Sequence, residues 1–140
     1  HTVSILHDIS LKDGRLAEVH DINQPGLSAE DKQIILAHPA ESSLIVSRAK
    51  DLPPDVETMI LQHHERPDGQ GFPGKLAALS ISPLTCIFIL AEKIVKDIYG
   101  KKVSAELMQK SILTITEDYN RGNFKNVIKA IQKSNLGKSR

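Results

Sequence analysis

Residues 61–76 read LQHHERPDGQGFPGKL, and this stretch joins a helix-like segment to a loop. The adjacent imidazoles of His63 and His64 end an apolar run, and three glycines and two prolines follow within residues 67–74. Glycine lets a backbone turn tightly, whereas proline restricts it. The stretch therefore predicts two histidines at the end of a helix beside a stiff loop, and the rest of the chain has to show what they bind.

The composition is that of one globular domain over residues 1–140. With 40% hydrophobic and 25% charged residues, the chain can bury a core. The net charge of +1 favours neither a nucleic-acid polymer nor a membrane as a partner. The single cysteine, Cys86, excludes an internal disulfide, lies in an apolar run and is expected to be a buried, inert thiol. We therefore expect a cytoplasmic protein.

Helix signals dominate the chain, and we expect an all-α fold of six or seven helices. Ser28 followed by Asp31 predicts a helix start, and Pro39 predicts a break or kink after His38. Residues 13–27 and 66–82 are expected to be connections. The segment that ends at Gly100 is expected to be a mostly buried helix. That helix covers residues 82–100, and the other expected helices cover residues 3–11, 40–50, 52–65, 104–116 and 124–133.

Ionisable side chains interrupt four otherwise apolar segments. They are His7, Asp8, His38, His63, His64 and Glu92. Buried ionisable groups have to be paired or have to coordinate an ion. Imidazoles and carboxylates without thiolates suit iron, manganese, nickel or zinc. The residues alone also allow the plainer interpretation that these histidines only cap helix ends.

The adjacent pair of histidines bears on the number of ions. Neighbouring residues on a helix point about 100° apart, so His63 and His64 would not easily chelate one ion. They could serve two ions, with a carboxylate such as Asp8 bridging. Two bridged ions can activate a water molecule and stabilise a phosphoryl displacement. The pattern thus favours a two-metal hydrolase.

Three strings of the sequence resemble those of a known family. LHDIS at 6–10, AHPAESSLI at 37–45 and HHERPDGQGFPGKL at 63–76 are similar, in order and spacing, to the HD-GYP family. This subgroup of the HD-domain metal phosphohydrolases hydrolyses the bacterial messenger cyclic di-GMP. The resemblance covers about residues 3–104 and implies an HD-domain-type helical bundle with a metal site between helices. It also implies two divalent ions, iron or manganese.

The resemblance further implies roles for individual residues. The metal ligands would be the six ionisable residues named above, with Asp8 bridging the ions and acting in catalysis, and Glu92 standing in for an aspartate. The loop 66–73 would lie beside the substrate and could contact diguanylate cyclase (GGDEF) domains. The implied substrate-binding residues are Arg66, Asp68, Gly69, Gly71, Phe72, Pro73 and Lys101.

The sequence departs from the family at three positions. Ser10 and Leu11 replace the glycine and lysine of the motif HDxGK, and Phe72 replaces a tyrosine. The helices that precede the HD dyad in the family are not found before His7. The expected activity is hydrolysis of cyclic di-GMP to pGpG and GMP. The alternatives are a degenerate module that binds metal, nucleotide or a protein without turnover, and an HD-type hydrolase for another phosphate ester.

Overall fold

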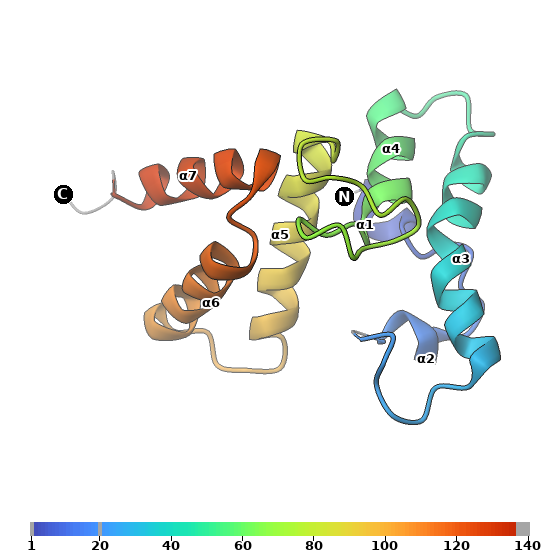
Figure 1. The fold of residues 1–140 in the computed structure, drawn as a ribbon, viewed down its shortest axis with the longest axis horizontal. Coiled ribbons are helices and arrows are strands. Elements are labelled where there is room, and N and C mark those ends of the chain that lie inside the picture. The colour runs from blue at the N-terminus through green and yellow to red at the C-terminus, as the bar shows by residue number, and fades with distance from the viewer. Residues whose placement is uncertain (1, 20, 137–140) are drawn as a thin grey trace.

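The computed structural model describes residues 2–19 and 21–136, and the regular structure within them is entirely helical (Figure 1). The predicted all-α class is therefore confirmed. The helices are α1 (Thr2–Leu6), α2 (Gly14–Ala17), α3 (Ala29–Val46), α4 (Pro54–Gln62), α5 (Pro83–Ile98), α6 (Ala105–Asp118) and α7 (Gly122–Leu136).

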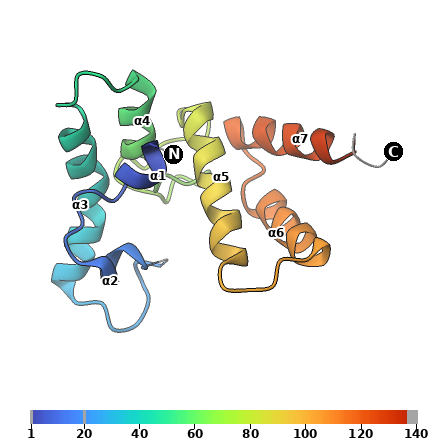
Figure 2. The same cartoon turned by 180° about the vertical axis from the view of Figure 1, so that it is seen from behind.

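The helices pack as two groups that share α5. Helix α3 packs against α4, and α4 also contacts α1 and α5, whereas α6 and α7 both pack on α5. Figures 1 and 2 show α1 between α4 and α5, near the middle of the molecule. The residues that follow α1 therefore begin where the two groups meet.

Each group has its own apolar cluster. The cluster between α5, α6 and α7 contains Ile81, Cys86, Ile89, Leu90, Ile115, Phe124 and Ile128. The cluster between α1, α3 and α4 contains Val3, Val46, Val56 and Ile60. The Cys86 side chain is fully buried, as predicted, and this burial raises the pKa of its thiol to about 12.

Helix α3 confirms one prediction and corrects another. Ser28 and Asp31 form a reciprocal capping box at its start, as predicted. The predicted break at Pro39 is wrong, because α3 runs through this proline. Proline lacks the N–H that would bond the carbonyl four residues back, that of Ile35. The His38 ring lies 2.6 Å from that carbonyl and takes the hydrogen bond instead.

Other differences concern helix ends and exposure. Helix α1 ends at Leu6 and α4 at Gln62, so the dyad His7–Asp8 and the pair His63–His64 lie just beyond helix ends. The expected mostly buried helix, α5, is buried on one face only. On its other side Leu84, Ile87 and Val95 are exposed, because α6 and α7 cover only part of its surface.

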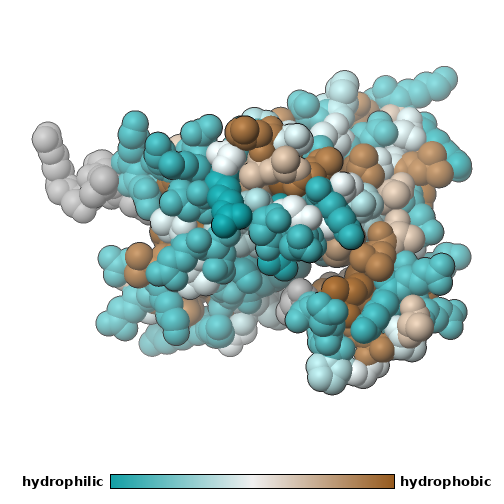
Figure 3. Space-filling view, viewed as in Figure 1, coloured by the Kyte–Doolittle hydropathy of each residue, from teal (hydrophilic) through white to brown (hydrophobic). Residues whose placement is uncertain are grey.

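The surface is mainly polar on the face that Figure 3 shows, with hydrophobic side chains scattered over it. Among the described residues, no helix combines the length and apolar character that crossing a membrane requires.

Candidate metal centre

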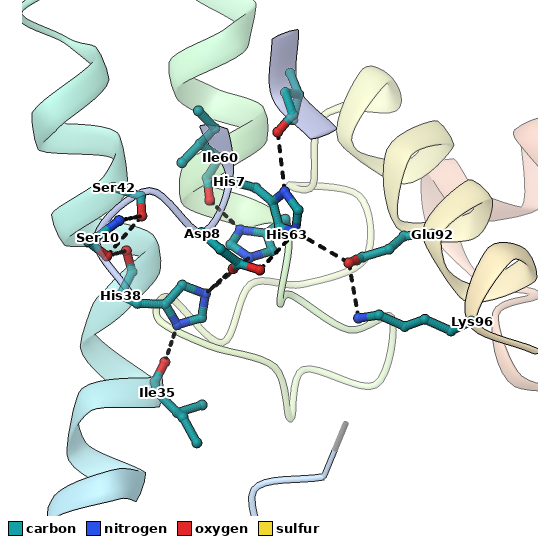
Figure 4. A network of polar contacts seen from close by, with 11 residues as sticks. His7, Asp8, Ser10, Ile35, His38, Ser42, Ile60, His63, Glu92 and Lys96 are labelled. Carbon is teal, nitrogen blue, oxygen red and sulfur yellow. Dashed lines mark hydrogen bonds and ion pairs between the residues drawn. The ribbon is translucent and has the colours of Figure 1, made fainter. Parts of the chain in front are cut away.

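Side chains that follow α1, lie in α3 and follow α4 point toward one another (Figure 4). Within the described residues, Asp8, His38, His63 and His64 each offer one ligand atom, and these atoms all lie within 4.8 Å of one another. Asp8 follows α1, His38 lies inside α3, and the adjacent histidines follow α4. The expectation that His63 and His64 would not easily chelate one ion is not supported by the geometry, since both rings contribute an atom to this group.

His38 is oriented by the proline that follows it. Its Nδ1 lies 2.6 Å from the Ile35 carbonyl, which Pro39 leaves without its usual helical donor. Because a carbonyl oxygen only accepts hydrogen bonds, Nδ1 carries the proton. The Nε2 atom therefore faces Asp8, whose Oδ1 lies 3.1 Å away, and is the ring atom that could ligate a metal ion.

His63 reaches the same pose at a helix end. Its Nδ1 lies 2.6 Å from the carbonyl of Ile60, in the last turn of α4, where carbonyls lack intrahelical donors. The Nε2 atom of His63 lies 3.2 Å from that of His38 and 3.7 Å from Asp8 Oδ1. Histidines that bind metals usually donate the other ring N–H to a carbonyl or carboxylate in this manner.

The convergence of these atoms provides a test of whether the residues fit a metal ion. With Nδ1 of each ring on a carbonyl, the Nε2 atoms of His38 and His63 and the Oδ1 atom of Asp8 lie within 3.7 Å of one another. Such an arrangement is unfavourable unless positive charge lies among the atoms. A proton can satisfy one pair of them, whereas a divalent cation satisfies all three. The donor set therefore fits a metal ion of the kind that takes nitrogen and oxygen ligands.

Asp8 is held in place by a short serine network. The Ser10 hydroxyl donates to the His38 carbonyl at 3.1 Å, and Ser42 donates to Ser10 Oγ at 2.9 Å. The Ser10 backbone N–H also donates to Ser42 Oγ. These bonds tie the turn that carries Asp8 to α3. Burial alone would raise the pKa of Asp8, but the ring nitrogens of His38, His63 and His7 beside it hold that pKa well below the usual range, so the side chain is an anion.

A second set of ionisable groups adjoins the first. His7 Nε2 lies 3.0 Å from Asp8 Oδ2 and 3.5 Å from Glu92 Oε1. Burial lowers the pKa of His7, but the two carboxylates outweigh this effect and raise it to about 10. Burial raises the pKa of Glu92, and contacts with His7 and Lys96 outweigh this and lower it to about 2. His7 and Glu92 are thus beside the four-residue cluster rather than within it.

His64 connects the metal centre to the loop. Its ring stacks on Phe72, with centroids 4.6 Å apart and planes inclined by 14°. Burial, reinforced by the neighbouring His63 and His38, lowers the pKa of His64 to about 2. The ring is therefore neutral near pH 7 and can act as a ligand.

The loop after His64 is anchored by a buried carboxylate. Glu65 accepts hydrogen bonds from the backbone N–H groups of Gly74 at 2.6 Å and Leu76 at 2.9 Å. A Cβ atom at Gly71 would overlap the backbone of Glu65 and Arg66. The predicted need for glycine in this loop is therefore confirmed at Gly71 by close backbone approach, and at Gly69 by a φ of +72°.

A polar cavity of about 890 Å³ opens beside His63 and His64. Of the predicted substrate-binding residues, Arg66, Asp68 and Phe72 line it. Gly69, Gly71 and Pro73 shape the loop behind them. Lys101 is not among the lining residues, because it lies beyond the C-terminal end of α5, where its Nζ donates to the Asp97 carbonyl at 2.6 Å.

Three cations of the cavity wall were not predicted from the sequence. Lys93, Lys96 and Arg121 line the cavity, which also carries acidic residues such as Asp97 and Glu117. The spacing of Glu92 and Lys96, four residues apart on one helix, was the signal that could have found Lys96. Arg121 lies between α6 and α7, and no local pattern marks it.

Comparison with known proteins identifies the family. A family model described as HD domain matches residues 16–111, more than half of the chain. The chain therefore belongs to the HD domain family. The matched segment contains His38, His63, His64 and Glu92 but begins after His7 and Asp8, whose place in the site comes from the structure. No curated protein and no solved structure matches the chain.

Family and site agree on the broad class. HD domains bind divalent metals and act as metal-dependent phosphohydrolases, and this chain has a cluster of histidines and an aspartate that fits such an ion. The class of the protein is therefore a metal-dependent hydrolase of the HD domain family.

Proposed function

We propose that this domain is a phosphodiesterase that hydrolyses cyclic di-GMP to pGpG and GMP in bacterial signalling, as in the HD-GYP subgroup. One observation carries the proposal. The segment 63–76, which resembles the HD-GYP signature, contributes two histidines to the cluster and then forms a wall of the adjoining cavity. A single short segment thus connects the metal ligands to the place where a substrate would lie.

The cavity suits a phosphodiester of nucleotide size. Its volume of about 890 Å³ lies within the range of small-molecule sites. Arg66, Lys93 and Arg121 can pair with phosphate oxygens, and guanidinium groups do so with two parallel hydrogen bonds. The Phe72 ring offers an apolar surface on which a base can stack.

We propose two divalent ions, iron or manganese, as cofactors. The first would be held by His38, His63, His64 and Asp8, and the second by His7, Glu92 and Asp8. Bound ions of this kind supply a nucleophile at neutral pH and stabilise the charge of the transition state. The chain holds the carboxylates as anions and orients His38 and His63 through the carbonyls of Ile35 and Ile60.

The test is hydrolysis of cyclic di-GMP by purified protein loaded with Mn²⁺ or, without oxygen, with Fe²⁺, followed by chromatography of the products. We expect pGpG and then GMP, and no product from the Asp8→Ala variant. Cleavage of other phosphate esters, with cyclic di-GMP left intact, would assign the domain to a different HD-type hydrolase.

A second candidate is a module that binds metal and nucleotide without turnover. The replacement of a family lysine by Leu11 and of a family tyrosine by Phe72 favours it. The Leu11→Lys variant separates the two candidates, since a rise in turnover indicates an enzyme weakened at this position. Binding of cyclic di-GMP by both proteins with no product from either supports the module. We also propose that the loop 66–73, of which Arg66, Asp68, Gln70 and Pro73 are exposed, contacts diguanylate cyclase domains, which a binding assay with an isolated GGDEF domain tests.

A further inference from the structure

The Lys96 side chain shares one carboxylate oxygen with His7. Lys96 Nζ lies 3.0 Å from Glu92 Oε1, and His7 Nε2 lies 3.5 Å from the same oxygen (Figure 4). Glu92 and Lys96 are one turn apart on α5, so the contact needs no movement of the backbone. An ammonium group therefore already contacts the oxygen that a second metal ion would need.

This ion pair is shielded from water in part. The side chains of Lys96 and Glu92 are 34% and 21% exposed. An ion pair in such a place is screened by salt less than one on an open surface. An incoming cation would therefore have to displace Lys96 from Glu92 as well as shed water.

The four-residue cluster carries no such competitor. Within the described part of the chain, the ion pairs of Asp8 are with His7, His38 and His63 only. No lysine or arginine of residues 2–19 and 21–136 forms an ion pair or hydrogen bond with the ligand atoms of that cluster. His7 contacts a carboxylate of each set, whereas the ammonium group of Lys96 contacts the second set only.

We propose that Lys96 competes with the second metal ion for Glu92, so that the centre binds its first ion tightly and its second ion more weakly. This inference rests on the two-metal function proposed above. It also gives Lys96 a second position. When the second ion takes Glu92, the flexible lysine stem swings into the cavity that it lines, where its ammonium can meet a substrate phosphate.

The experiment is a calorimetric titration of metal-free protein with Mn²⁺, paired with electron paramagnetic resonance, which distinguishes a single Mn²⁺ from two that are magnetically coupled. We expect two binding steps in the wild type. The Lys96→Met variant should tighten the second step by roughly tenfold, the scale on which outer partners alter metal affinity. The first step should change little, and the coupled signal should appear at lower Mn²⁺ concentration.

The Lys93→Met variant is the matched control. Lys93 lies on the same helix and lines the same cavity, but it forms no ion pair with any described residue. It should leave both steps nearly unchanged. Equal tightening by the two variants would show a general effect of charge and overturn the inference, as would an unchanged second step in Lys96→Met.

The outcomes also separate this inference from the proposed function, because no substrate is used. Two unequal steps that respond to Lys96→Met, with cyclic di-GMP left uncleaved, would support the inference and contradict the phosphodiesterase. Cleavage of cyclic di-GMP together with two equal metal-binding steps would support the phosphodiesterase and contradict the inference about Lys96. The absence of any Mn²⁺ binding would overturn both.

Discussion

His38 and His63 adopt the same pose by different means. Each ring has Nδ1 2.6 Å from the carbonyl three residues before it, and their Nε2 atoms lie 3.2 Å apart. In α3 the carbonyl is free because Pro39 removes a donor from the middle of the helix. In α4 the carbonyl is free because the helix ends. A helix can thus orient a metal ligand wherever it leaves a carbonyl unused.

The difference lies in what each pose depends on. His38 depends on one residue, Pro39, inside a helix that is otherwise regular and well capped. His63 depends on where α4 stops and on the loop that follows, which Glu65 anchors. The two histidines should therefore be disturbed separately, by substitutions that leave the other in place.

The largest effect is expected at Asp8, which lies beside both His38 and His63. Its Oδ1 lies near both Nε2 atoms, so Asp8→Ala removes a contact of each histidine. We expect metal affinity to fall by more than about 100-fold, since loss of a ligand should exceed the loss of an outer partner. Calorimetric titration with Mn²⁺ measures this, with Asp55→Ala on α4 as a control. Unchanged affinity would remove Asp8 from the ligand set.

Gly71→Ala should disturb the His63 side alone. Its Cβ would overlap the backbone of Glu65 and Arg66, and overpacking of this kind costs about 1–3 kcal/mol. We expect a lower melting temperature and weaker metal binding. Gly14→Ala is the control, because its Cβ meets no atom within 4 Å. If Gly71→Ala matched this control in both measurements, the loop would not be holding the histidines.

Pro39→Ala should disturb the His38 side alone. The new N–H can donate to the Ile35 carbonyl and so compete with the His38 ring for it. Since proline is unfavourable inside a helix, we expect equal or higher thermal stability together with roughly tenfold weaker metal binding. Thermal melts and Mn²⁺ titration of the same sample check both parts. A variant that binds metal as tightly as the wild type would show that Pro39 does not orient His38.

Ser28→Ala tests whether the overall stability of α3, rather than Pro39, orients His38. The substitution removes the cap of α3, which is worth typically about 1 kcal/mol, but it leaves Pro39 and Ile35 as they are. We expect lower stability of the metal-free protein and unchanged intrinsic metal affinity, measured well below the melting temperature. A parallel loss of affinity would mean that general stability of α3, rather than the freed carbonyl, orients His38.

Local patterns predicted the parts of the fold that local chemistry controls. The capping box at Ser28, the loop over 66–82 and the closing turn at Gly100 all follow from neighbouring residues. The break at Pro39 was mispredicted because the hydrogen bond that compensates for proline comes from a side chain. The hydrophobic periodicity of a sequence does not reveal a hydrogen bond between a histidine ring and a carbonyl of the same helix.

The candidate site was predictable in kind but not in geometry. Ionisable residues in apolar segments indicated Asp8, His38, His63 and His64 as a group, and the structure brings them together. The separation of these four residues from His7 and Glu92 depends on how α1 and α5 pack, and no local sequence spacing specifies that packing. The placement of Lys101 away from the cavity, and of Lys96 within it, depends on the same packing.

The central claim is that Asp8, His38, His63 and His64 form a metal centre. The most direct measurement is elemental analysis of the protein purified without added metal or chelator, with the Asp8→Ala variant prepared in parallel. We predict at least one equivalent of iron or manganese in the wild type and a large loss in the variant. A wild-type protein without bound metal that also takes up none on titration, or a variant with the same metal content, would contradict the account.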